Sequence, residues 1–194
     1  MNKEDRYIGT NSGRIFHPFA PRVEEVYMPD VVHSLSNIRR WNGHTDSNYV
    51  VGQHCIETYK FVKDAGGSIL SQFKGLMHDT AEAYSVDLPS PIKLGLPGFV
   101  EMEDGIWAAI MKAHNMDVQM PPIVKAGDKW QLMRESVHLF SQESVWLKEQ
   151  DPLQVERARK QSFPKVMDYH EVYAEFWKIY NVLYATLVHA PVSD

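Results

Sequence analysis

The stretch of residues 73–93 places several ionisable side chains inside an apolar run with helical spacing. His78 and Asp79 are adjacent, and Glu82 follows them by four and three residues. Residues three and four apart share one face of a helix, so we expect Glu82 to lie on the same side as the pair. Buried ionisable groups are costly unless they are paired or bind metal. The stretch therefore predicts either a helix with a polar outer face or one wall of a metal site.

Apolar residues recur at three-and-four spacing along most of the chain, which predicts helices. The predicted helices cover about 31–37, 50–62, 68–83, 99–114, 121–137 and 164–189. Candidate N-caps are Asp30 for the first, residues 45–47 for the second and Ser68 for the third. Two prolines in residues 87–91 are expected to hold the chain extended. The fold predicted for residues 1–194 is one all-α domain.

Two segments fall outside this helical pattern. Residues 1–29 are rich in glycine and proline, and we expect an irregular appendage with a small hairpin near Arg14-Ile-Phe16. The pattern also thins between 141 and 163, where Asp151-Pro152 indicates a break. The aromatic stripe of the last helix is expected to pack in the core or at a subunit interface.

Composition excludes several classes of protein. A chain of 194 residues with 44% hydrophobic content can fill one core. A net charge of −5 provides no basic surface for a nucleic acid polymer, and the single cysteine, Cys55, excludes a disulfide framework. The charged first residues do not resemble a secretory signal, and no apolar run of about 18 residues exists to span a membrane. We therefore expect a cytoplasmic protein.

Four candidate metal ligands come from three predicted helices. They are His54, His78, Asp79 and Asp128. Taken alone, His54 reads as a core histidine, and Asp128 as the partner of Lys125 in a solvated ion pair. Together, two imidazoles and two carboxylates suit a divalent ion such as Zn, Co, Mn or Mg. Glu82 would then act as base or acid for a water at that ion.

The order of His54, His78-Asp79 and Asp128 resembles the HD-domain phosphohydrolase superfamily. Arg40-Trp41, residues 78–93 and residues 124–128 look like the branch that holds bacterial 5′-deoxynucleotidases and phage dATP triphosphohydrolases. The resemblance covers roughly residues 30–140. It implies an HD-domain helical bundle that hydrolyses deoxynucleotides with a divalent metal.

The resemblance also implies roles for individual residues. Glu82 would act near the hydrolytic water, Arg40, Lys93 and Lys125 would hold phosphates, Trp41 would pack where a 2′-hydroxyl would lie, and Asp87 would recognise the sugar. Gly43 follows Trp41 at a position where a bulky side chain could help to choose the base, and adenine is the base that we favour.

The expected substrate is a small deoxynucleotide. Arg40, Lys93, Lys125 and the ion would carry more positive charge than one phosphate requires, so we expect dATP cleaved to deoxyadenosine and triphosphate. The alternative is a 5′-deoxynucleotidase acting on monophosphates. Two other classes stay open, namely a metal-bound module that binds a nucleotide without turnover and a structural or interaction protein. We expect a homo-oligomer, either a dimer or a hexamer, with no membrane partner.

Overall fold

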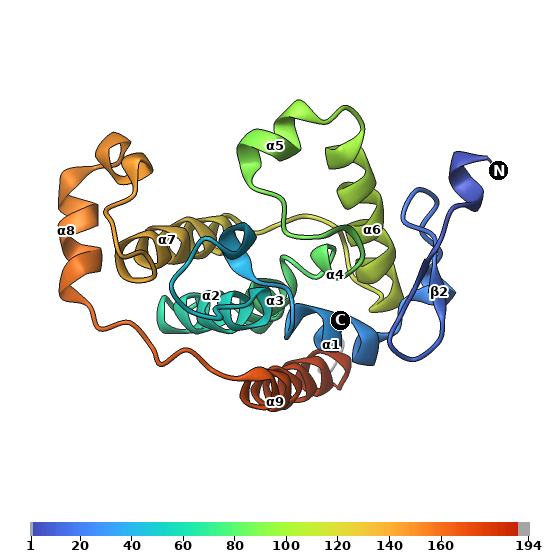
Figure 1. Ribbon diagram of the computed structural model, residues 1–194. Coiled ribbons are helices and arrows are strands. Elements are labelled where there is room, and N and C mark those ends of the chain that lie inside the picture. The colour runs from blue at the N-terminus through green and yellow to red at the C-terminus, as the bar shows by residue number, and fades with distance from the viewer. Residues whose placement is uncertain (1, 190–194) are drawn as a thin grey trace.

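Helices dominate the computed structural model, which describes residues 2–189, so the all-α prediction is confirmed (Figure 1). The α-helices are α1 Met28–Leu35, α2 Val51–Asp64, α3 Ile69–Met77, α4 Glu82–Ser85, α5 Ser90–Gly95, α6 Phe99–Ala113, α7 Pro122–His138, α8 Pro152–Lys160 and α9 Tyr169–Val188. Short 3-10 turns are η1 Lys3–Asp5, η2 Val23–Glu25, η3 Arg40–Gly43 and η4 Val145–Glu149. No helix within residues 2–189 combines the length and apolar character needed to cross a bilayer.

The main core lies where α2 and α3 pack on each other and on α9. Cys55 and Ile56 of α2, Phe73 of α3 and Phe176 of α9 are all inaccessible to solvent. A second, smaller cluster joins α7 to α8 and contains Met133, Leu147, Val155 and Ala158. Since α2 packs against both α3 and α7, it positions side chains from all three helices around one site.

The predicted hairpin is confirmed. Strand β1 (Ile8–Gly9) pairs antiparallel with β2 (Ile15–Phe16), and Phe16 is completely buried in the main core. The prediction that Asp30 caps the first helix is wrong, because Asp30 lies inside α1. Its carboxylate instead accepts hydrogen bonds from the Thr10 hydroxyl at 2.7 Å and the Ser12 backbone N–H at 2.8 Å. Asp30 thus ties the hairpin loop to α1.

Of the N-caps predicted for α2 and α3, the first is wrong and the second is confirmed. Residues 45–47 do not cap α2, which starts at Val51. The Val51 N–H bonds to the Ile38 carbonyl at 3.0 Å, so the backbone bridge beside it replaces a side-chain cap. Ser68 does cap α3, as predicted, by accepting from the Ser71 N–H at 3.1 Å.

The continuous helix predicted over 68–83 is wrong, since α3 ends at Met77 and α4 begins at Glu82. Both the N–H and the hydroxyl of Thr80 bond to the Met77 carbonyl, at 2.9 and 2.6 Å. These bonds to a residue three positions back wind the chain more tightly than an α-helix. His78 and Asp79 therefore lie at a turn between two helices.

Proline positions explain two further differences. The segment expected to be extended turns into α5 at Ser90, because Pro91 occupies the first turn, where its missing N–H costs nothing. The predicted break at Asp151-Pro152 is the start of α8, with Asp151 accepting from the Leu153 N–H at 2.9 Å. The last helix starts later than predicted, at Tyr169, where Asp168 and Glu171 form a capping box.

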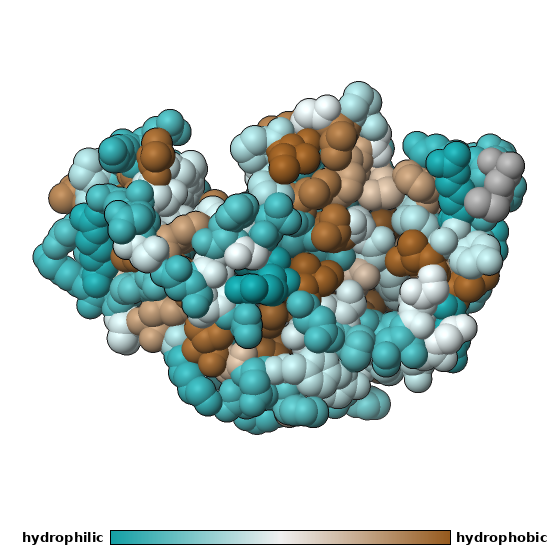
Figure 2. All heavy atoms as spheres, viewed as in Figure 1, coloured by the Kyte–Doolittle hydropathy of each residue, from teal (hydrophilic) through white to brown (hydrophobic). Residues whose placement is uncertain are grey.

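The surface around α5 differs from the surface around α8. Figure 2 shows hydrophobic residues gathered over α5, whereas hydrophilic residues dominate around α8. Ile92, Leu94 and Leu96 are 47%, 80% and 45% exposed. These exposed apolar residues, in α5 and directly after it, lie one to three positions from Lys93, a predicted substrate contact.

Candidate metal centre

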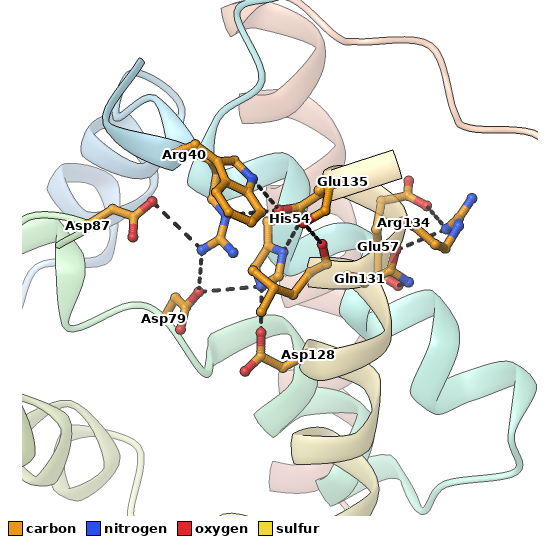
Figure 3. A network of polar contacts seen from close by, with 12 residues as sticks. Arg40, His54, Glu57, Asp79, Asp87, Asp128, Gln131, Arg134 and Glu135 are labelled. Carbon is orange, nitrogen blue, oxygen red and sulfur yellow. Dashed lines mark hydrogen bonds and ion pairs between the residues drawn. The ribbon is translucent and has the colours of Figure 1, made fainter. Parts of the chain in front are cut away.

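The predicted ligands converge from α2, α7 and the turn between α3 and α4. His54, His78 and Asp79 form a group in which one ligand atom of each lies within 4.8 Å of the others. The His54 Nε2 atom is 3.5 Å from Asp79 Oδ2 and 3.1 Å from Asp128 Oδ1 (Figure 3). It is also 3.1 Å from His78 Nε2. The His78 Nε2 atom is 3.3 Å from Asp79 Oδ2 and 3.9 Å from Asp128 Oδ1. The structure thus brings together all four residues that the sequence predicted.

These separations fit a single ion. Ligand atoms about 2.1 Å from a metal are about 3.0 Å apart in adjacent octahedral positions and about 3.4 Å apart in a tetrahedron. The measured separations between donor atoms run from 3.1 to 3.9 Å, so the shorter ones lie close to both values. His54, His78 and Asp79 therefore form a possible metal site, with Asp128 beside it.

The hydrogen bonds of the two imidazoles favour a cation between them. His54 Nδ1 bonds to Glu135 Oε1 at 2.5 Å, and His78 Nδ1 bonds to the Gly75 carbonyl at 2.9 Å. Both partners are acceptors, so both Nδ1 atoms carry protons and both Nε2 atoms are left to face each other. Two facing lone pairs repel unless a proton or a metal lies between them. This arrangement is typical of metal-binding histidines.

The surrounding carboxylates also favour positive charge here. Burial opposes charge on His78, but Asp79 outweighs it, and the pKa of His78 lies well above its ordinary value. For His54, burial and Arg40 lower the pKa while Glu135 and Asp128 raise it, and the net pKa is raised. These charges favour a positive charge near the two Nε2 atoms.

Glu135 is a site residue that the sequence reasoning missed. It is fully buried on α7, and besides His54 it accepts from Arg40 Nε at 3.3 Å and Trp41 Nε1 at 3.1 Å. Burial would raise its pKa, but Arg40 and His54 outweigh burial and lower it. Glu135 comes seven residues after Asp128, two helical turns along the same face, and this spacing is the signal that could have identified it.

Arg40 lies among acidic groups. Its Nη1 is 3.4 Å from Asp79 Oδ2 and 3.8 Å from Asp87 Oδ2, in addition to the Glu135 contact. The predicted excess of uncompensated positive charge is therefore wrong for Arg40, because three carboxylates surround its guanidinium. Asp87 is brought to the site, as predicted, through this arginine.

Trp41 lies beside the same network in an unusual backbone conformation. Trp41, Asn42 and Gly43 have φ values of 57°, 51° and 78°, three successive residues in the left-handed region. The turn places the indole N–H on Glu135 and the ring edge-on to Phe140, with centroids 5.2 Å apart. The side chain is thus fixed at both its polar and its apolar end.

Glu82 opens α4, three residues after Asp79, and is 6% exposed. Its Oε2 atom is buried and has no hydrogen-bond partner within the part of the chain that the structure describes. Burial, reinforced by the charges of Asp79 and Asp87, raises the pKa of the Glu82 carboxyl well above its ordinary value. An unpartnered carboxyl of this kind can give or take a proton.

The two lysines that were predicted to bind phosphate, Lys93 and Lys125, differ in their surroundings. Lys93 Nζ pairs with Glu103 Oε2 at 2.8 Å. The positive charge of Lys93 partly offsets the rise in the pKa of the Glu82 carboxyl, so Lys93 lies near the site. Lys125 is exposed, and its side chain makes no hydrogen bond or ion pair within residues 2–189. The expectation that both ammonium groups border the metal ligands is therefore not met for Lys125, because its side chain leaves α7 toward solvent.

Comparison with known proteins adds two relatives. No protein-family model matches the chain. The uncharacterized protein RCAP_rcc00048 of Rhodobacter capsulatus is 27% identical over 123 residues, which cover 61% of this chain and 63% of that protein, just under two thirds. The uncharacterized protein YfdR of Escherichia coli strain K12 is 34% identical over 129 residues, 66% of this chain and 70% of YfdR. At this identity and coverage, the chain belongs to the same family as YfdR.

Proposed function

We propose that this protein is a metal-dependent phosphohydrolase of the HD-domain type that acts on deoxynucleotides. The observation that carries the proposal is the pair of His54 and His78 Nε2 atoms, 3.1 Å apart, with both Nδ1 atoms bound to acceptors. A structural bundle has no need to bury two imidazoles face to face beside two carboxylates. Such a set suits Zn, Co, Mn or Mg.

The residues around this set supply the remaining parts of a phosphate-ester hydrolysis. A divalent ion held by His54, His78, Asp79 and Asp128 would supply positive charge against the phosphate oxygens. Glu82 accepts a proton from the attacking water or returns one to the leaving oxygen. Arg40 holds a phosphate oxygen by exchanging one of its carboxylate contacts for it.

Trp41 and Asp87 support a preference for deoxyribose. Both contact the Arg40–Glu135 network, so a sugar attached to a phosphate at Arg40 lies between them. In this proposal, the Trp41 ring occupies the space that a 2′-hydroxyl would need, and Asp87 accepts from the 3′-hydroxyl. This arrangement supports deoxynucleotides over ribonucleotides as substrates.

The charge balance bears on the length of the phosphate chain. We keep dATP, cleaved to deoxyadenosine and triphosphate, as the first candidate substrate. A second candidate is a deoxynucleoside monophosphate, because Arg40 and Lys93 are already paired with carboxylates and Lys125 points to solvent. With less free positive charge, the site requires fewer negative charges from its substrate.

The test is a parallel assay of dATP, dAMP, ATP and AMP, with products separated by ion-exchange chromatography. Chelation should abolish turnover, and a divalent transition ion should restore it. Triphosphate from dATP supports the first candidate, whereas orthophosphate from dAMP with dATP untouched selects the 5′-deoxynucleotidase. The Trp41→Ala variant should lower the ratio of the turnover rate for deoxynucleotides to the turnover rate for ribonucleotides. Full turnover in excess chelator, or binding of all four nucleotides without turnover in added metal, would contradict the proposal.

A further inference from the structure

A large cavity lies away from the metal centre, between α2, α7 and α8. Its volume is about 1000 Å³, at the upper end of the range of roughly 300–1000 Å³ for small-molecule sites. Trp130 and Phe61 contribute aromatic surface to its walls. No predicted site residue lines it, so the proposed hydrolase activity leaves it without a role.

The cavity is on the opposite side of α7 from the metal ligands. Asp128 and Glu135, seven residues apart, lie on the face of α7 that meets His54. Trp130 and Arg134, four residues apart, lie between about a third and half of a turn around α7 from that face and line the cavity. In Figure 3, Arg134 and Glu57 lie to one side of the His54–Glu135 pair, away from Arg40 and Asp79. A ligand in the cavity would not touch the metal ligands.

The lining carries an excess of positive charge, although the whole chain has a net charge of −5. The ionisable side chains are Lys60, Lys129, Arg134 and Arg157 against Glu57 and Asp64. Glu57 Oε1 pairs with Lys60 at 2.8 Å, and its Oε2 lies 3.9 Å from Arg134 Nη1. Lys129 and Arg157 have no carboxylate partner within residues 2–189. The cavity can therefore accept an anion with at least two negative charges.

Arg134 provides a fixed cationic wall. Its Nη1 bonds to Gln131 Oε1 at 2.9 Å, and its Nη2 bonds to the Ser162 carbonyl at 2.8 Å. Its Nε is buried and finds no acceptor among the residues that the structure describes. The guanidinium is thus held rigidly at the cavity with one donor unused, which favours an acceptor group nearby.

The aromatic part of the lining favours a planar ring. The Arg157 guanidinium lies 5.4 Å from the centroid of the Trp130 ring. Guanidinium and indole groups both stack on flat conjugated rings, and base–aromatic stacking contributes about 1–3 kcal/mol. The rear of Trp130 packs on the small cluster that contains Met133 and Val155, which fixes the orientation of its ring.

We propose that this cavity is a second binding site, for a nucleotide whose base stacks at Trp130 and Arg157 and whose phosphates contact Lys129 and Arg134. The site requires no metal. It shares α2 and α7 with the metal centre, and Gln131 Nε2 bonds across to the Glu57 carbonyl at 3.2 Å. A nucleotide bound here would contact α7, which presents Asp128, and would lie beside lining residues of α2, which presents His54.

Calorimetric titration of the full chain with dATP in excess chelator tests the site, because metal-dependent turnover is then absent. Arg157→Ala and Lys129→Ala should each weaken a binding component at least tenfold. Lys160→Ala should change it less than twofold, because Lys160 is a basic residue of α8 that does not line the cavity. Both test variants replace exposed side chains, so neither should impair folding.

Two results would overturn the proposal. One is dATP binding that Arg157→Ala and Lys129→Ala leave within twofold of the wild-type protein. The other is binding of inorganic triphosphate as tight as that of dATP, which would exclude recognition of the base. The outcome is independent of the hydrolase assay, since a protein without hydrolase activity can still show this binding.

Discussion

The two facing imidazoles depend on single residues behind them, above all Glu135. We predict that Glu135→Gln lowers metal affinity about 10–100-fold, the usual effect of losing the carboxylate that orients a metal-binding histidine. The substitution keeps the shape of the side chain but removes the charge that His54 Nδ1 and Arg40 Nε contact. Metal affinity can be measured by competition with a coloured chelator.

Glu57→Gln is the matched control for this prediction. Glu57 is also a buried glutamate, but its carboxylate contacts Lys60 and Arg134 instead of His54. Equal losses of affinity in both variants would show that Glu135 acts through general stability and not by positioning His54.

Glu82 is the other residue whose surroundings carry a specific expectation. We predict that Glu82→Gln keeps metal and substrate but loses about 10²–10⁴ in turnover rate, the usual contribution of a general acid or base. An amide cannot exchange the proton that the buried carboxyl can. Glu101→Gln, on the exposed face of α6, should retain full turnover. A Glu82→Gln variant as fast as the wild-type protein would remove Glu82 from the mechanism.

At the scale of the elements, α2 packs closely against α9 and α1 at Gly52. A Cβ there would lie 2.7 Å from Val172 Cγ1 of α9 and 3.1 Å from the Leu35 carbonyl oxygen of α1. We predict that Gly52→Ala lowers the free energy of unfolding by about 1–3 kcal/mol, because a packed neighbour has to move. Urea denaturation followed by circular dichroism measures this change.

Gly95→Ala serves as the control for Gly52→Ala. Gly95 ends α5, and a Cβ there would meet no atom within 4 Å. Alanine at that position should be neutral or stabilising by about 0.4–1 kcal/mol, since it restricts the unfolded chain. A Gly52→Ala variant as stable as Gly95→Ala would contradict the close packing of α2.

At the scale of the whole molecule, the metal ligands link α2, α7 and the turn between α3 and α4. An ion that binds only the folded chain stabilises it by about 2.7 kcal/mol at a hundred times its Kd. For a chain of this length, we predict a rise in Tm of roughly 5–10 °C on metal addition and its reversal by chelator, measured by differential scanning calorimetry.

Two alanine variants test whether the rise in Tm comes from metal bound at this centre. Asp128→Ala should lose most of the metal-dependent rise, because Asp128 Oδ1 is 3.1 Å from His54 Nε2. His138→Ala should retain it, because His138 bonds to the Ala158 carbonyl, away from the metal centre. A rise that is equal in both variants would place the ion elsewhere.

The sequence by itself determined the helical class and which four residues cluster as candidate metal ligands. Three-and-four spacing of apolar residues is a local property, and it located α2, α6, α7 and α9 with shifts only at their ends. The ligand set was visible because histidine and aspartate stood out inside or beside apolar runs, where an unpaired ionisable group is costly.

The tertiary structure decided how these parts meet. The packing of α2, α3 and α7 decides which carboxylates balance the charge of Arg40. It also places Glu135 behind His54 and directs Lys125 to solvent. The turn at residues 78–81 likewise follows from bonds of Thr80 to Met77 that compete with helix continuation. Charge pairing acts over a few ångströms between residues far apart in the chain, so local spacing can suggest a candidate such as Glu135 but does not show which charges pair.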